Sequence, residues 1–146
     1  MTISSPEFTD KGKMPSKYTC DGEDINPPLI FGNVPEDTQS LALIVDDPDA
    51  PGKTWLHWIV FNIPPHTSHI SEDSVPVGAD EAVTDFGHKG YGGPCPPTGI
   101  HRYNFKLYAL DTTLDVTEDI TKEEIEHAME GHILDKAELT GLYSRE

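Results

Sequence analysis

Proline and glycine recur along the whole chain, with 13 prolines and 12 glycines among 146 residues. Proline removes a backbone hydrogen-bond donor, and glycine loses more conformational entropy on ordering than other residues, so both destabilise the interior of a helix. Their density nearly excludes long helices. We therefore expect a chain built mainly from strands and loops, folded as a single domain over residues 1–146.

Strands are indicated by short apolar segments and by one clear alternation. Residues 41–45 form a short apolar run, and the almost continuous apolarity of 56–63 indicates a strand that is covered on both faces. Residues 102–110 alternate: Tyr103 and Phe105 lie on one face, and Arg102 and Lys106 lie on the other. A last strand is expected over 133–143. The polar segment 64–85 is interpreted as a long surface excursion.

One short helix is predicted at about 121–130. Thr121 and Glu124 have the spacing of a capping box, and Ile120 with Ile125 has that of the accompanying hydrophobic staple. Gly131 is placed to end the helix. The predicted fold is therefore mainly β, an antiparallel sandwich with one short helix.

Titratable side chains cluster at the ends of three predicted strands. Asp47 and Asp49 follow 41–45, His57 lies in the second strand, and His101 begins the third. Because side chains alternate along a strand, His101 is expected on the Tyr103 side, Asp47 on the side of Leu43 and Val45, and His57 on the side of Ile59 and Phe61. A bulge would reverse such an assignment.

The loop before His101 is dense in glycine and proline, and it contains Gly93 and Pro94. Such a loop can hold a rigid shape close to a ligand. A carboxylate beside an imidazole favours the imidazolium form, and an imidazolium next to backbone N–H groups suits a phosphate or carboxylate. We therefore expect Asp47 and Asp49 to hold the rings of His57 and His101 around a small anion.

Other interpretations of these residues stay open. Two histidines and two aspartates could bind a divalent metal, although the tight i, i+2 or i, i+4 spacing of many metal sites does not occur. A hydrolase could use Cys95 or Thr98 near His101, although the chain has no G-x-S-x-G motif. The aspartate–proline segment that starts at Asp46 could also be no more than a stabilised turn.

Charge and segment composition limit the partners. The net charge of −16 repels nucleic acid and anionic lipid, so neither partner is expected. The sequence shows neither a signal peptide nor an apolar run long enough for a membrane span, which predicts a cytoplasmic protein without stable membrane insertion. In a reducing cytoplasm Cys20 and Cys95 are expected as free thiols, with a disulfide between them as the alternative.

Several motifs together resemble the phosphatidylethanolamine-binding protein family, which includes the Raf kinase inhibitor proteins. They are DDPDAP at 46–51, HW at 57–58, GYGGP at 90–94 and HRY at 101–103, and the segments 19–29 and 131–139 are similar to the family's prokaryotic YbhB/YbcL branch. The resemblance implies a β-fold with an anion pocket. The matching positions are Asp47, Asp49, His57, Gly93, Pro94, His101 and Tyr103.

The resemblance also implies a biological role. Members of this family mostly bind and regulate, so we expect a small-anion or phospholipid-headgroup binding protein of the regulatory type, without enzymatic activity, cofactor or metal. A kinase or protease partner and a homodimer are implied as well. An inhibitor that acts through its protein surface is the first alternative, and a hydrolase or metal-assisted enzyme is the second. The helix that closes the pocket in eukaryotic members has no counterpart after residue 143, so a more open pocket is expected.

Overall fold

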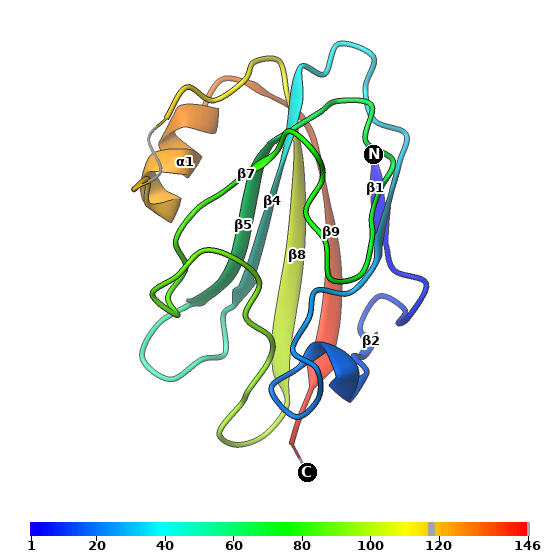
Figure 1. Cartoon of the computed structure of the whole chain (residues 1–146), viewed down its shortest axis with the longest axis vertical. Helices are drawn as coiled ribbons and strands as arrows, with labels where there is room; N and C mark the ends of the chain where they lie inside the picture. The colour runs from blue at the N-terminus through cyan, green and yellow to red at the C-terminus, as the bar shows by residue number, and fades with distance from the viewer. Residues whose placement is uncertain (117–118, 146) are drawn as a thin grey trace.

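A computed structural model describes residues 1–116 and 119–145 as two sheets and one α-helix (Figure 1). The larger sheet has the strand order β2-β9-β8-β4-β5-β7, and the smaller sheet has the order β1-β3-β6. Neighbouring strands pair antiparallel, except β2 and β9, which run parallel. The mainly β class with one short helix is therefore confirmed. The strands are β1 (Thr2–Ser4), β2 (Gly12–Lys13), β3 (Leu29–Gly32), β4 (Ser40–Asp47), β5 (Trp55–Ile63), β6 (His69–Ile70), β7 (Asp80–Glu81), β8 (His101–Leu110) and β9 (Ile133–Tyr143).

The larger sheet lies at the centre of the molecule, because both faces of its four long strands are covered. One face packs on the smaller sheet through a core that includes Leu43, Trp58 and Phe105. The other face packs on the helix through Ile44, Ile59 and neighbouring apolar residues. Every residue of β4 is buried, as expected for a strand covered on both sides.

The helix α1 (Lys122–Met129) begins with the predicted capping box. The Thr121 hydroxyl accepts a hydrogen bond from the backbone N–H of Glu124 at 3.1 Å, and the Glu124 carboxylate accepts from the Thr121 backbone. Ile125 is fully buried and Met129 nearly so, so one side of the helix covers the larger sheet. Figure 1 shows α1 beside the upper half of the sheet, far from the lower end where β4 stops.

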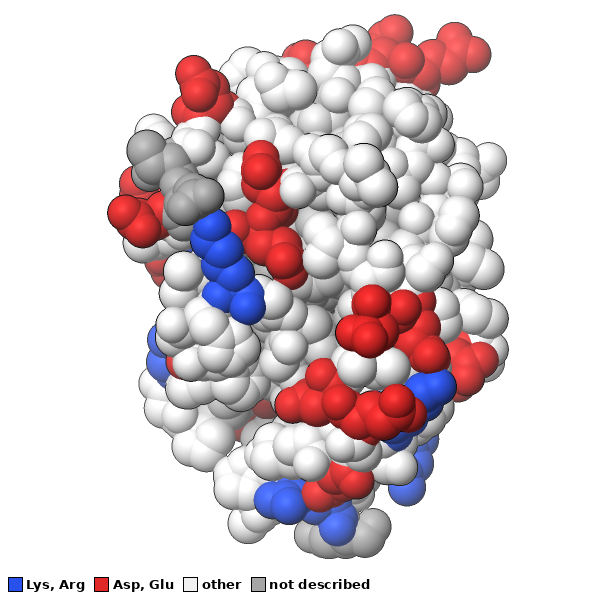
Figure 2. All heavy atoms as spheres, viewed as in Figure 1, with Lys and Arg blue, Asp and Glu red and all other residues white. Residues whose placement is uncertain are grey.

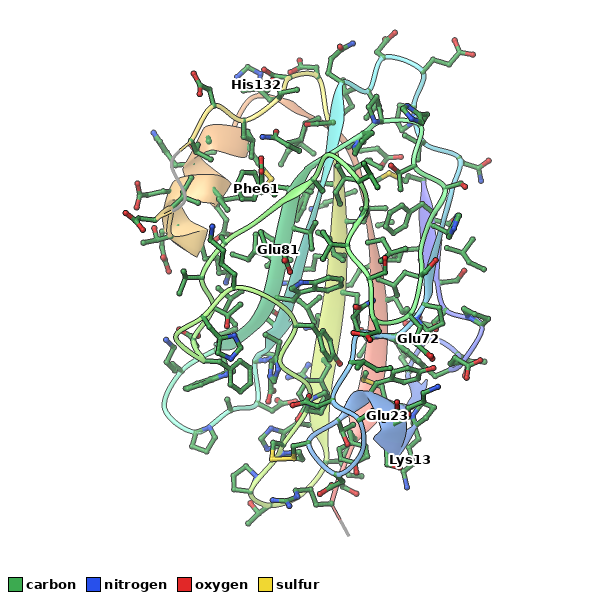
Figure 3. The ribbon with its side chains drawn as sticks, in the orientation of Figure 1. Lys13, Glu23, Phe61, Glu72, Glu81 and His132 are labelled. Atoms are coloured by element: carbon green, nitrogen blue, oxygen red, sulfur yellow. A yellow bond between two sulfur atoms is a disulfide. The ribbon has the colours of Figure 1, made fainter. Side chains whose placement is uncertain are left out.

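The segment 64–85 is only partly the surface excursion that was expected. It contributes β6 and β7, and its Ile70 and Ala82 are buried in the two cores. Glu81, labelled in Figure 3, accepts a hydrogen bond from Nε1 of the buried Trp58 at 2.7 Å. Buried apolar residues and a carboxylate therefore help to attach this polar segment to the core.

Acidic charge predominates on one face of the molecule. Figure 2 shows acidic side chains across the face in view, with few lysine and arginine side chains among them. Within residues 1–116 and 119–145, no helix has the length and apolarity that crossing a bilayer demands.

Candidate functional site

The antiparallel arrangement brings three strand ends together. Strand β4 runs antiparallel to both of its neighbours, so its end meets the start of β5 and the start of β8. Asp47 ends β4, His57 is the third residue of β5, and His101 is the first residue of β8. The loops that follow β4 and precede β8 lie at this same end of the sheet (Figure 1).

Asp46 and Asp47 point to opposite sides of β4. Asp46 lies on the helix side, where its Oδ2 is 3.0 Å from Nζ of Lys106 and 3.7 Å from Nζ of Lys122. Asp47 turns to the other side, as its shared parity with Leu43 and Val45 predicted, and accepts a hydrogen bond from Nδ1 of His101 at 2.7 Å. Alternation along the strand therefore commits one aspartate to the ion pairs beneath α1 and the other to the strand-end cluster.

His57 lies at an irregularity in the sheet. Val45 pairs with Trp58 and Asp46 pairs with Leu56, so the register skips His57. The expected shared face with Ile59 and Phe61 is therefore wrong, because the irregularity turns the His57 ring toward Tyr103, with 5.2 Å between the ring centroids. The His57 Nδ1 lies 2.6 Å from the carbonyl oxygen of Gly92.

The Asp47–His101 pair is almost completely removed from water. Asp47 is 3% exposed and His101 is 7% exposed. The second carboxylate oxygen of Asp47 accepts the backbone N–H of Asp49 at 2.8 Å, so both oxygens have partners. A carboxylate can only accept, so Nδ1 of His101 carries the proton of this hydrogen bond. The ring is therefore held in one orientation, and its Nε2 is left for another partner.

Tyr103 lies between the two imidazoles. Its ring is edge-on to His57 and stacks with His101 at a centroid distance of 6.4 Å. Tyr103 is only 1% exposed, yet its hydroxyl oxygen has no hydrogen-bond partner within residues 1–116 and 119–145. Burial raises the pKa of this phenol, and the nearby Asp47 and Asp49 raise it further, so the hydroxyl keeps its proton.

These side chains border a hollow of about 220 Å³. Its polar lining comes from Asp47, His57, His101 and Tyr103, which the sequence had indicated. The remaining wall is made of apolar side chains and the disulfide-bonded Cys95, and most of it was not anticipated. These lining residues are Ala50, Pro51, Trp55, Phe86, Cys95, Pro96 and Pro97.

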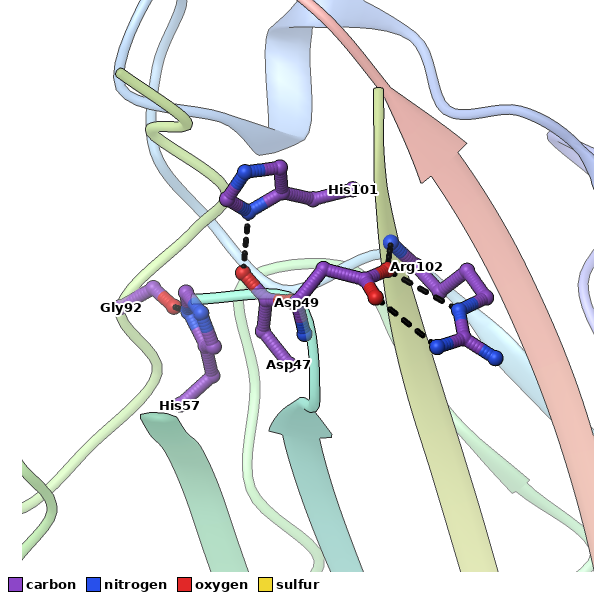
Figure 4. A network of polar contacts seen from close by, with 6 residues as sticks. All are labelled: Asp47, Asp49, His57, Gly92, His101 and Arg102. Carbon is purple, nitrogen blue, oxygen red and sulfur yellow. Dashed lines mark hydrogen bonds and ion pairs between the residues drawn. The ribbon is translucent and has the colours of Figure 1, made fainter. Parts of the chain in front are cut away.

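Asp49 takes a different role from the one expected. Its carboxylate accepts from the backbone N–H, Nε and Nη2 of Arg102, at 2.9, 2.9 and 2.8 Å (Figure 4). The hydrogen bonds from Arg102 lower the pKa of Asp49 to about 2. Asp49 therefore anchors the loop after β4 to β8, while the imidazoles are held by Asp47 and by the Gly92 carbonyl.

The family model described as "Phosphatidylethanolamine-binding protein" matches residues 4–144. The chain belongs to the phosphatidylethanolamine-binding protein family. The resemblance noted from its motifs is thus confirmed at the level of the family.

Relatives in this family cover the chain almost completely. A UPF0098 protein of Methanothermobacter thermautotrophicus is 51% identical over 150 residues, which cover 99% of each chain. A crystal structure from Chlamydia trachomatis, described as a phosphatidylethanolamine-binding protein homolog, has a TM-score of 0.95 and 42% identity, covering 99% of this chain and 97% of that one. Escherichia coli YbcL, described as a member of the mammalian family, has a TM-score of 0.92 and 32% identity, with 99% and 98% covered.

In this family member, Gly93 and Pro94 support the pocket without lining it. The Gly93 N–H donates to Oδ1 of Asp24 at 2.7 Å, and the Pro94 carbonyl accepts the N–H of Cys20 at 3.1 Å. The glycine is needed here because a Cβ atom would overlap the carbonyl oxygen of Tyr18. These contacts attach residues 90–95, which we call the strap, to residues 18–24.

A disulfide also joins the strap to that segment. Cys20 and Cys95 are bonded, with 5.4 Å between their Cα atoms, and no free cysteine is present. The expectation that Cys20 and Cys95 are free thiols is therefore wrong. The hydrogen bond from Cys20 to Pro94 explains the pairing, because it brings the two backbones within disulfide distance.

The metal alternative gains no support from the geometry. Within residues 1–116 and 119–145, no group of three or more histidine, cysteine, aspartate or glutamate side chains is arranged to hold a metal ion. Asp49, which would have completed the set of two histidines and two aspartates, is bound to Arg102.

Proposed function

We propose that the pocket binds a small oxyanion, a phosphate or carboxylate group, and that the protein works as a regulatory binding protein. The single observation that carries the proposal is Tyr103: its ring lies between two imidazoles and lines the hollow, and its buried hydroxyl has no hydrogen-bond partner within the described residues. Burying a polar group without a partner costs free energy, and a bound oxyanion would remove that cost.

The size and lining of the hollow support a small ligand. Its volume of about 220 Å³ is below the range typical of drug-sized pockets. The few polar atoms lie close together, so they can surround one charged group, and the apolar wall would exclude water around it. A single headgroup or a free ion fits this description better than an extended substrate.

Covalent catalysis is not favoured by the same wall. The Asp47–His101 pair has the arrangement of a general base, but a nucleophile would have to stand beside it. Of the residues that line the hollow, none is serine or threonine, and the sulfur of Cys95 is held in the disulfide. We therefore propose binding in preference to hydrolysis. Regulation of a kinase or protease and assembly as a homodimer stay proposals that rest on the family.

Titration calorimetry with inorganic phosphate and with acetate tests the proposal. Wild-type protein should bind at least one of them, and Tyr103→Phe should weaken that binding about tenfold, because one hydrogen bond to a charged group is lost. The unfolding free energy of Tyr103→Phe should stay the same or rise, since the buried hydroxyl has no partner to lose within the described residues.

Tyr108→Phe is the matched control, because Tyr108 lies on the same strand but outside the hollow. Its affinity should equal that of the wild type. No heat with either anion, or equal binding by Tyr103→Phe and Tyr108→Phe, would show that the pocket is not the binding site.

A further inference from the structure

The hydrogen on the His57 ring can be placed from its surroundings. The Gly92 carbonyl, 2.6 Å from Nδ1, can only accept, so Nδ1 carries the proton. His57 is 4% exposed, and this burial lowers its pKa even though Asp47, Asp46 and Asp24 act in the opposite direction. The ring is therefore neutral at neutral pH, and its Nε2 presents a lone pair.

The other polar atoms of the pocket have a different character. The Tyr103 hydroxyl holds a proton that no acceptor takes up within the described residues, so it is a donor for any ligand oxygen that reaches it. The Nε2 of His101 donates when the ring is an imidazolium and accepts when it is neutral, because Nδ1 is committed to Asp47. The pocket therefore combines donors with one fixed acceptor, Nε2 of His57.

We propose that this fixed acceptor makes the pocket select oxyanions that keep an O–H group over those that have none. The inference rests on the proposed anion-binding function and specifies its ligand class. A ligand O–H would donate to His57, while other ligand oxygens would accept from Tyr103 and from the imidazolium form of His101. An oxyanion without hydrogen would place a lone pair against the lone pair of His57, unless the buried ring first took up a proton from the solvent.

The proposal separates several sources of phosphate. Inorganic phosphate keeps an O–H group throughout the neutral range. A phosphomonoester keeps one only below its second pKa of about 6. A phosphodiester, the form found in a lipid headgroup, has none, and neither does sulfate. The pocket should therefore prefer free phosphate to sulfate and to a diester, and should accept a monoester better in its singly ionised form.

Calorimetry at pH 7.5 and constant ionic strength, with inorganic phosphate, sulfate, methyl phosphate and dimethyl phosphate, tests this selectivity. Phosphate should bind about tenfold more tightly than sulfate or dimethyl phosphate, as expected when a buried acceptor loses its partner. The affinity for methyl phosphate should rise when the pH is lowered from 7.5 to 6. Equal affinities for phosphate and sulfate in the wild type would overturn the inference while leaving anion binding intact.

The variant His57→Gln provides an independent test. Its amide could turn either an oxygen or an N–H group toward the ligand, so the phosphate-to-sulfate ratio should fall below about threefold. The exposed His69 on β6 supplies the control His69→Gln, which should keep the wild-type ratio. If His57→Gln does not fold, the wild-type ratio still decides. If no oxyanion binds the wild type at all, the proposed function fails, and the selectivity fails with it.

Discussion

Loss of the Cys20–Cys95 disulfide should destabilise the protein strongly, because the bond closes a long loop. The two cysteines are 75 residues apart in the sequence. A cross-link removes entropy from the unfolded chain in proportion to the logarithm of loop length, and for this loop the relation gives about 4.5 kcal/mol at 25 °C. That is a large share of the 5–15 kcal/mol by which typical domains are stable, and corresponds to a fall in Tm of roughly 10–15 °C.

The double variant Cys20→Ser/Cys95→Ser should still fold. The strap keeps its hydrogen bonds to residues 18–24, through Gly93 and Asp24 and through Cys20 and Pro94, and Tyr91 donates to the Tyr18 carbonyl at 2.8 Å. The loss should therefore appear as reduced stability of a native fold. Measured values below the full entropic figure, down to about 2 kcal/mol, agree with this reasoning, because residual structure in the unfolded chain lowers the gain from a cross-link.

Urea unfolding followed by tryptophan fluorescence measures the difference. Wild-type protein should first show no titratable thiol when it is denatured without a reductant. Dithiothreitol should lower the wild-type midpoint to that of the double variant and leave the double variant unchanged. Two reactive thiols in the native preparation, or a difference below about 1 kcal/mol between wild type and double variant, would refute the argument.

Two further predictions concern the loops around the pocket. Gly93→Ala should cost about 1–3 kcal/mol in unfolding free energy, because the added Cβ would overlap the Tyr18 carbonyl. The control Gly87→Ala should show only the cost of its positive φ of 85°, since nothing lies within 4 Å of a Cβ at that site. Equal losses of unfolding free energy in the two variants would contradict the packing argument. The pKa of Asp49 is lowered, so its bond to Arg102 should stabilise the fold above the unfolded pKa of about 3.9 and lose this effect as the pH falls toward 2. The stability difference between wild type and Asp49→Asn should accordingly shrink between pH 5 and pH 2.5 in urea titrations, and a constant difference would show that the charge is not responsible.

The strands and the helix could be predicted from the sequence because their signals are local. The alternation over 102–110 corresponds to β8 at His101–Leu110, and the capping box places α1 within a residue or two. Each signal depends on residues that are neighbours along one element, so no knowledge of the partner strand is needed.

The candidate site was predicted less completely, because its details depend on pairing between strands. The face of His57 was wrong, since the irregularity opposite Val45 and Asp46 exists only in the register of β4 against β5. Asp49 was assigned to an imidazole, but the Asp47 carboxylate accepts the Asp49 N–H, and the resulting tight turn leaves the Asp49 side chain facing Arg102. No pattern in the sequence could show either event.

The apolar wall of the pocket was missed for a related reason. Trp55 and Phe86 pack edge-on at 5.6 Å, although they are separated by a polar segment that looks like surface. Neither residue belongs to a motif that carries chemistry. A residue at a strand end such as Trp55, or in a loop such as Phe86, becomes part of a site only when the chain returns to the same sheet end, and this depends on the whole topology.

The strong negative charge and an anion pocket are compatible, because the two act over different distances. Asp46, Asp47 and Asp49, three acids at the end of β4, are each paired, with Lys106, His101 and Arg102 in turn. Unpaired carboxylates elsewhere are screened over about 8 Å at physiological salt. An extended polyanion such as nucleic acid would meet many of them at once, whereas one small oxyanion would meet mainly the hydrogen bonds of the pocket wall. The net charge of −16 therefore argues against the first kind of partner and leaves the second to the local geometry.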